Sequence, residues 1–146
     1  MTVFVVDASV ALKWVIPEVG AEAALALRAA DRLIAPDLIV AECANALWKM
    51  VSRGEMSPEE AELAAETLAR ADVELHPMRR LLVAATKMAI ALDHPAYDCV
   101  YLALAEAETC PFVTADARLV RKLQASGAPG AAIDLAAAAH SLAARP

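Results

Sequence analysis

One short apolar run at the start of the chain constrains its fold more than any other feature. Residues 2–6 read TVFVV, are mostly β-branched, and lead directly into Asp7. A run this short and apolar predicts a strand that is buried on both faces, as in a parallel sheet covered by helices. Asp7 then lies at the carboxyl end of that strand, where sites form in α/β sheets. Aspartate is also among the best helix N-caps, so both roles stay open at this point.

Short strands alternate with helices along the rest of the chain. Further strands are predicted at residues 32–35, 73–75 and 112–114 and, from a weak signal, 131–135. Helices are predicted at residues 10–14, 19–30, 38–51, 58–71, 78–92, 97–108 and 116–123, with Asp37 and Ser57 as caps of the third and fourth. This alternation predicts βαβ units, and so a mainly parallel sheet with helices on both faces. A chain of 146 residues fits one domain, and an alanine-rich tail is expected from about residue 136.

Composition excludes several classes of protein. No uncharged apolar run approaches the roughly 18 residues of a membrane span, and the N-terminus lacks the basic region of a signal peptide. The three cysteines form no CxxC pair and predict reduced core thiols of a cytosolic protein. A net charge of −6 argues against a broad basic surface for nucleic acid. It does not exclude nucleic acid, because bound divalent cations invert the local field.

Four carboxylates occupy places where an ordinary surface charge is not expected: Asp7, Glu42, Asp98 and Asp116. Two of them lie at or just beyond strand ends, and two lie near the starts of apolar helices. In a doubly wound sheet these places can border one crevice. Three polar neighbours could support them: Ser9, Asn45 and Thr114. For Asp98 and Asp116 the alternative role is again that of a helix cap, and Glu42 could be an ordinary helix residue.

Carboxylates gathered in this way raise one another's pKa unless a cation neutralises them. Ligands that are all oxygen suit Mg²⁺ or Mn²⁺, which can activate a water and stabilise charge on a phosphodiester. The chain has no histidine pair or cysteine cluster of the kind that binds zinc, and its four glycines form no phosphate-binding loop. The three histidines, His76, His94 and His140, are interpreted as structural or exposed.

Four sequence blocks, in this order, resemble the PIN domain: VVDASVALKW, PDLIVAECANALWK, HPAYDCVYLALAE and FVTADARLVRKL. More narrowly they resemble the VapC-type toxins of prokaryotic VapBC toxin–antitoxin modules, over residues 2 to about 135. The resemblance implies a three-layer α/β/α fold, with residues 1–146 as a single PIN domain. Carried over by position, the four acids match the family's catalytic and metal-binding carboxylates. Thr114 matches its supporting Thr or Ser, and Asn45 stands where many members carry Asn.

The resemblance also implies an activity and partners. The expected activity is that of a Mg²⁺- or Mn²⁺-dependent endoribonuclease, in which a metal-activated water attacks the phosphorus and leaves a 5′-phosphate. The expected substrate is RNA of the tRNA or rRNA class. The expected protein partners are a cognate VapB-type antitoxin and a second copy of the chain in a homodimer. The expected location is the cytoplasm.

Three other readings remain open. A PIN nuclease could process RNA outside a toxin–antitoxin module. A non-catalytic PIN module could bind RNA or a protein partner, although that reading predicts lost acids and none is lost. A phosphotransfer domain would also use an aspartate at the end of the first strand. However, the phosphatase pattern needs a second aspartate where Ser9 stands, and a receiver domain needs a late lysine where the chain has Thr114.

Overall fold

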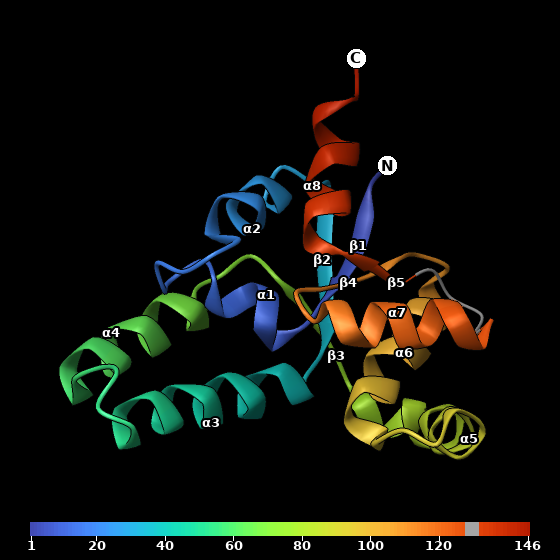
Figure 1. Ribbon diagram of the computed structural model, residues 1–146, viewed down its shortest axis with the longest axis horizontal. Helices are drawn as coiled ribbons and strands as arrows, with labels where there is room; N and C mark the ends of the chain where they lie inside the picture. The colour runs from blue at the N-terminus through green and yellow to red at the C-terminus, as the bar shows by residue number, and fades with distance from the viewer. Residues whose placement is uncertain (128–131) are drawn as a thin grey trace.

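The computed structural model describes residues 1–127 and 132–146, and a single parallel sheet runs through its centre (Figure 1). The strand order is β3-β2-β1-β4-β5, and every neighbouring pair is parallel. The strands are β1 (Val3–Val6), β2 (Arg32–Pro36), β3 (Glu74–His76), β4 (Phe112–Thr114) and β5 (Ala132–Asp134). The first strand is therefore the middle of the sheet. The α/β fold class expected from the sequence is confirmed.

Helices cover both faces of this sheet and connect its strands. They are α1 (Ala8–Leu12), α2 (Ala21–Leu27), α3 (Leu38–Ser52), α4 (Pro58–Ala69), α5 (Leu82–Leu92), α6 (Ala96–Glu108), α7 (Ala117–Ser126) and α8 (Leu135–Ala143). A 3₁₀ turn, η1 (Met78–Leu81), precedes α5, so the predicted helix from residue 78 begins in a tighter geometry. Within residues 1–127 and 132–146, the helices are all too short or too polar to cross a membrane.

Alternation along β1 divides the apolar core into two layers. Val5 packs in the larger cluster, with residues of α3, α5, α6 and α7. Phe4 and Val6, on the opposite face, pack in a second cluster with residues of α2 and α8. Successive side chains of a strand point to opposite faces, so a strand between two helical layers must be apolar at every position. The uninterrupted run VFVV meets that requirement.

The carboxyl end of β1, where the sequence predicts a site, lies at the point where the strand order reverses. From β1 the chain passes to β2 on one side, while the later strand β4 pairs with β1 on the other. The β1–β4 register aligns Val5 with Phe112 and Val6 with Val113. The residue after β1, Asp7, therefore lies beside the last residue of β4, Thr114. Ligands of open α/β sheets bind in the crevice at such a reversal.

Asp37 lies at the predicted N-cap position of α3, but its side chain does not cap the helix. The backbone there is already helical, with φ −63° and ψ −11°, and the side chain makes no capping hydrogen bond. Capping geometry needs an extended backbone at this position, which Ser57 does provide, and Ser57 Oγ accepts from Glu60 N at 3.1 Å. The Asp37 carboxylate instead accepts from Met78 N at 3.3 Å and links β2 to η1.

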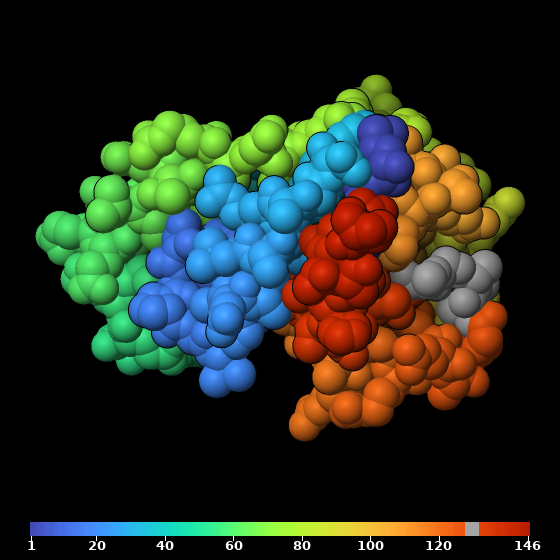
Figure 2. Space-filling model, turned by 90° about the horizontal axis from the view of Figure 1, so that it is seen from above, coloured from blue at the N-terminus to red at the C-terminus, as the bar shows by residue number. Residues whose placement is uncertain are grey.

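The alanine-rich end of the chain is a helix, not the tail that its composition indicated. Asp134 caps it by accepting from Ala137 N at 2.8 Å, and Leu135 and Ala138 are buried. Figure 2 shows α8 lying side by side with α2 on one face of the molecule, and the two helices share the second core cluster. Of the weakly predicted last strand, residues 132–134 form β5, while residue 131 lies outside the described residues.

We expect Leu27→Ala to destabilise the fold far more than Leu25→Ala on the same helix. Leu27 is fully buried in the layer between α2 and α8, whereas Leu25 is 49 % exposed. Truncating a buried leucine costs roughly 2–5 kcal/mol, and a surface truncation costs under about 1 kcal/mol. Urea unfolding followed by circular dichroism measures both variants. Equal losses in the two variants would contradict the packing of α8 on α2.

Candidate functional site

Asp7 joins the central strand to the first helix. Its backbone is extended, with φ −105° and ψ 178°, and its Oδ1 accepts a hydrogen bond from Val10 N at 3.1 Å. Asp7 is therefore the N-cap of α1. Only 8 % of the residue is exposed, so this carboxylate is buried as well as capping. A solvated surface carboxylate would serve as a cap without that burial, so capping alone does not account for Asp7.

Two hydroxyl groups complete the surroundings of the Asp7 carboxylate. Ser9 Oγ donates to Asp7 Oδ1 at 2.5 Å, and Thr114 Oγ1 donates to Oδ2 at 2.6 Å. Each hydroxyl also accepts from a backbone N–H: Ser9 from Ala115 at 3.0 Å, and Thr114 from Asp116 at 3.1 Å. Because these N–H groups occupy acceptor positions, each hydroxyl proton is directed at the carboxylate. Ser9 and Thr114, which were expected to support the site, thus both contact the Asp7 carboxylate, and their hydrogen bonds join the end of β1 to the end of β4.

The pKa of Asp7 is raised from its ordinary 3.8 to about 6, chiefly by burial. The hydrogen bonds from Ser9, Thr114 and Val10 N oppose this rise, and the negative charge of Asp98 contributes to it. Desolvation and a like charge both disfavour an ionised carboxylate, and donors favour it. The three donors therefore compensate only part of the cost of placing a charge here. A cation beside Asp7 would remove the remainder.

Asp98 lies in the first turn of α6, close enough to Asp7 for its charge to act there. Its Oδ2 is 2.6 Å from Nε2 of His94, which lies in the turn between α5 and α6. The side chain of Asp98 is 36 % exposed. Asp98 is therefore within electrostatic reach of the buried Asp7 and is also open to solvent.

Glu42 on α3 is fixed by a tyrosine from α6. Tyr101 Oη donates to Glu42 Oε1 at 2.5 Å, and the Tyr101 ring stacks on Phe112 of β4 with centroids 5.5 Å apart. Burial first, and then the hydrogen bond to Glu42, raise the pKa of Tyr101 far above its ordinary value, and Asp7 adds to the effect. Tyr101 therefore stays a hydrogen-bond donor, and it lies within electrostatic reach of both acids.

The remaining predicted site residues differ in their placement. Asp116 is the N-cap of α7, and its Oδ1 accepts from Arg118 N at 3.0 Å and Leu119 N at 3.2 Å. Its own N–H reaches Asp7 through Thr114 Oγ1. Asn45 is exposed on α3, and among the described residues its side chain has no hydrogen-bond partner. The structure thus connects Asp116 to Asp7 through its backbone N–H only, because its carboxylate caps α7, and it leaves Asn45 outside these contacts.

The donor chemistry of this site fits a hard divalent cation, although its carboxylates do not converge fully. Within residues 1–127 and 132–146, no three His, Cys, Asp or Glu side chains are close enough to bind one metal ion together. Asp7 and Asp98 nevertheless bring two oxygen donors of like charge near each other, the kind of group that Mg²⁺ or Mn²⁺ binds. Burial, with Glu42 and Asp7 adding, raises the pKa of Cys43 to about 12, so its thiol does not compete as a ligand at neutral pH.

Sequence reasoning missed three residues of this region: Tyr101, His94 and Lys122. The sequence could have indicated the contact between His94 and Asp98, because the two residues are four positions apart at the start of an apolar helix. The Tyr101–Glu42 bond joins residues 59 positions apart, and the contact of Lys122 with His94 spans 28 positions. Pattern in a single sequence carries no signal for pairs that only tertiary packing brings together.

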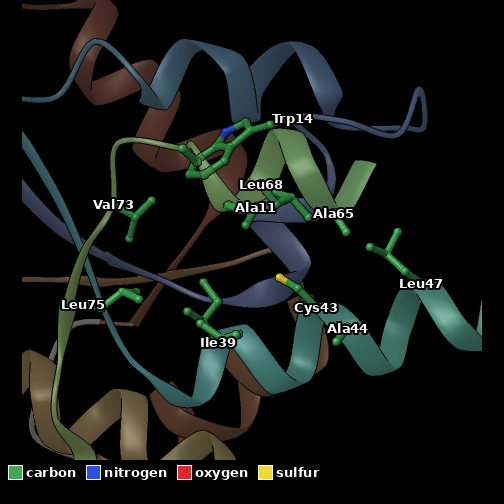
Figure 3. Close-up of a pocket in the computed structure, with 13 residues that line it drawn as sticks. Ala11, Trp14, Ile39, Cys43, Ala44, Leu47, Ala65, Leu68, Val73 and Leu75 are labelled. Atoms are coloured by element: carbon green, nitrogen blue, oxygen red, sulfur yellow. The ribbon is translucent and has the colours of Figure 1, made fainter. Parts of the chain in front are cut away.

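An apolar pocket of about 390 Å³ opens beside the acidic site. Figure 3 shows it between α3, α4, the end of α1 and the segment leading to β3, with the sulfur of Cys43 pointing into it. Trp14 lies at one end, where its Nε1 donates to Ala24 O at 2.7 Å. Because Cys43 follows Glu42 in α3, the pocket begins directly next to one of the four acids.

Comparison with known proteins places these features in a family. The PIN domain family matches residues 4–123 of the chain. Ribonuclease VapC9 of Mycobacterium tuberculosis is 36% identical over 115 residues, which cover 79% of this chain and 87% of that protein. Ribonuclease VapC3 of Pyrobaculum aerophilum is 34% identical over 128 residues, covering 86% and 98%.

Among solved structures, the crystal structure of PAE2754 from Pyrobaculum aerophilum has the same fold. The TM-score is 0.72 at 23% sequence identity, and the match covers 99% of this chain and 97% of that one. The family match includes most of β1, all of β4 and all four acids, and the matches to the two relatives extend along most of the chain. The chain therefore belongs to the PIN domain family, as one of its VapC-type members.

Proposed function

We propose that this protein is a Mg²⁺- or Mn²⁺-dependent endoribonuclease and the toxin of a type II toxin–antitoxin system. The observation that carries the proposal is the buried Asp7, whose pKa is raised to about 6 by burial and by the charge of Asp98. A carboxylate left in this state at a strand-order reversal has a strong electrostatic reason to bind a cation. The printed names of the VapC9 and VapC3 relatives, both ribonucleases, support RNA as the substrate.

The proposed roles follow from what each side chain contacts. Asp7 and Asp98 would hold the cation, with Glu42 and Asp116 completing or orienting its surroundings. When bound, the cation supplies an activated water and stabilises charge on the phosphodiester, and the product carries a 5′-phosphate. Ser9 and Thr114 hold the carboxylate of Asp7 in one orientation, and Tyr101 does the same for Glu42. Asn45 has the weakest claim, since it lies outside the cluster.

Two alternatives keep the fold and change the role. A PIN nuclease that processes RNA outside a toxin–antitoxin module would use the same acids, and it differs only in lacking an antitoxin. A module that binds RNA without cleaving it has no use for a buried carboxylate whose ionisation is disfavoured. The raised pKa of Asp7 therefore favours a nuclease over a binding module.

We expect purified protein to cut total RNA at discrete sites with Mg²⁺ or Mn²⁺ and not with EDTA. The substitution Asp98→Ala should lower the rate at least about a hundredfold, the size typical of losing one group that stabilises transition-state charge. Glu106→Ala, at an exposed position of the same helix, should cut at the wild-type rate. Mapping of 5′-phosphate ends identifies tRNA or rRNA targets. Cleavage that survives EDTA or Asp98→Ala would contradict the proposal.

We expect Asp7→Asn to stabilise the metal-free protein at pH 7.5. The pKa of Asp7 is higher in the folded state, about 6, than its ordinary 3.8, so the folded protein binds the extra proton and stability falls as pH rises through this interval. A neutral amide avoids this cost, roughly 2–3 kcal/mol for a shift of this size, and still caps the helix. Near pH 3, where Asp7 is largely protonated in both states, the gain should vanish.

Thermal unfolding at pH 3 and pH 7.5 checks this expectation. Mn²⁺ should raise the melting temperature of the wild type at pH 7.5 and leave that of Asp7→Asn nearly unchanged, because binding to the folded state alone stabilises it. Asp72→Asn, at an exposed position, serves as the control and should match the wild type throughout. If Asp7→Asn were no more stable than the wild type at pH 7.5, the charge of Asp7 would not lower the stability of the folded protein.

The proposed toxin requires an antitoxin partner, and the pocket beside Glu42 is a suitable surface for one. Its lining is almost wholly apolar, from Trp14 at one end to Leu47 at the other (Figure 3). An apolar segment of a VapB-type antitoxin bound there would lie next to the acids and obstruct access to RNA. Apolar pockets of this size at a surface are typical of binding sites.

We expect Ala65→Arg, on the pocket side of α4, to abolish inhibition by the product of an adjacent antitoxin gene. A long charged side chain would fill the apolar pocket, and RNA cleavage by the free variant should stay unchanged. Leu63→Arg is the matched control, because Leu63 is 63 % exposed on the same helix and does not line the pocket. Copurification and inhibition of cleavage measure the effect. Equal inhibition of the wild type, Ala65→Arg and Leu63→Arg would show that the antitoxin does not bind in this pocket.

The homodimer and the cytoplasmic location stay predictions within the same proposal. One feature supports a second copy: α5 exposes Leu82, Val83 and Ile90, at 66 %, 65 % and 77 %. An apolar face of this kind is more often covered than left in water.

A further inference from the structure

A chain of three polar side chains leads from α7 to the carboxylate of Asp98. Lys122 Nζ lies 3.0 Å from His94 Nδ1 and 3.1 Å from the carbonyl oxygen of Asp93. On the other side of the ring, His94 Nε2 lies 2.6 Å from Asp98 Oδ2. The three residues come from α7, from the turn between α5 and α6, and from the first turn of α6. The sequence interpretation of His94 as merely structural or exposed leaves both contacts unexplained.

The chemistry of lysine assigns the protons in this chain. An ammonium group has three donors and no acceptor, so His94 Nδ1 must accept from Lys122. A proton on Nδ1 would face the ammonium at 3.0 Å, lose the hydrogen bond and oppose the positive charge. The ring N–H therefore lies on Nε2, from which it donates to the carboxylate of Asp98. The hydrogen bond made by one ring nitrogen thus sets the role of the other.

We propose that His94 is a positioning residue, which Lys122 fixes in the Nε2–H tautomer so that it holds Asp98 by one carboxylate oxygen. Among the described residues, Asp98 Oδ1 accepts no hydrogen bond, and it remains available to a cation. The role assigned to Asp98 rests on the proposed metal-dependent nuclease, whereas the tautomer of His94 does not. Groups that orient a metal ligand in this way typically contribute 10–100-fold to metal affinity or activity.

The local backbone directs His94 toward Asp98. Asp93 ends α5 in the left-handed region, with φ 47° and ψ 55°, and His94 N donates to Ala89 O at 3.1 Å. This closure turns the chain back, and α6 then begins within two residues. Lys122 binds the carbonyl oxygen of Asp93 as well as the ring, so it ties α7 to the same turn. The side chain of His94 is only 15 % exposed, which limits competition from water.

The first measurement is the tautomer itself, on the metal-free full chain. Long-range proton–nitrogen correlation spectra at pH 7.5 distinguish the two imidazole nitrogens, and the chain has only three histidines to assign. We expect His94 to be protonated on Nε2 in the wild type. In Lys122→Met, which removes the donor to Nδ1, we expect a mixture of tautomers. A proton on Nδ1 of the wild-type ring would overturn the inference whatever the protein does to RNA.

The second measurement is Mn²⁺ binding by calorimetry, without RNA. His94→Leu should weaken the Kd by 10–100-fold. His94→Gln, whose amide nitrogen occupies the place of Nε2, should recover much of the affinity, and His140→Leu on α8 should match the wild type. Thermal unfolding identifies variants that fail to fold. A purely structural role would lower stability in His94→Leu and His94→Gln alike and leave the Kd of the folded fraction unchanged.

The outcomes separate this inference from the proposed function. A wild-type protein that neither binds Mn²⁺ nor cuts RNA would overturn the metal-dependent nuclease, and the positioning role with it. A wild type that binds Mn²⁺, together with a His94→Leu variant of the same Kd, would overturn the positioning role alone. Weaker binding in His94→Leu, with recovery in His94→Gln, supports both.

Discussion

The burial of one carboxylate, Asp7, determines how the site is built. A buried charge is costly unless donors surround it, and here the donors are Val10 N, Ser9 Oγ and Thr114 Oγ1. Two of them come from the start of α1, and the third comes from β4, more than a hundred residues later. The carboxylate is thus satisfied only when β1 and β4 are neighbours. The hydrogen bonds around Asp7 therefore depend on the strand order of the sheet.

The three hydrogen bonds offset only part of the cost of burying the Asp7 charge. With three donors in place, burial and the charge of Asp98 still hold the pKa of Asp7 near 6. A second acid of the region is also held by the core, because Tyr101 stacks on Phe112 and donates a hydrogen bond to Glu42. This uncompensated cost is what the proposed cation would relieve.

The two flanks of the site differ in chemistry. Figure 1 shows α3 and α4 extending on one side of the strand ends and α5, α6 and α7 gathered on the other. On the first flank, the pocket between α1, α3 and α4 is apolar. On the second, the contacts of Asp98 are polar and pass through His94 to Lys122. Under the proposed function, the apolar flank would suit the antitoxin and the polar flank the RNA substrate.

Much of this could be read from the sequence by itself, because local chemistry decides it. The apolar run before Asp7 required a strand between two helical layers, and Ser57 before Pro58 required a helix start. The spacing of the four acids relative to strand ends and helix starts predicted one shared site, which stays a prediction. The sequence failed where a backbone angle or a distant neighbour decides. Asp37 lies in a helical conformation that a cap cannot use, and the alanines after residue 135 form a helix because α2 offers Leu27 to pack against. Only the tertiary structure could pair Tyr101 with Glu42 and Lys122 with His94, since such contacts exist only after distant segments of the chain have packed together.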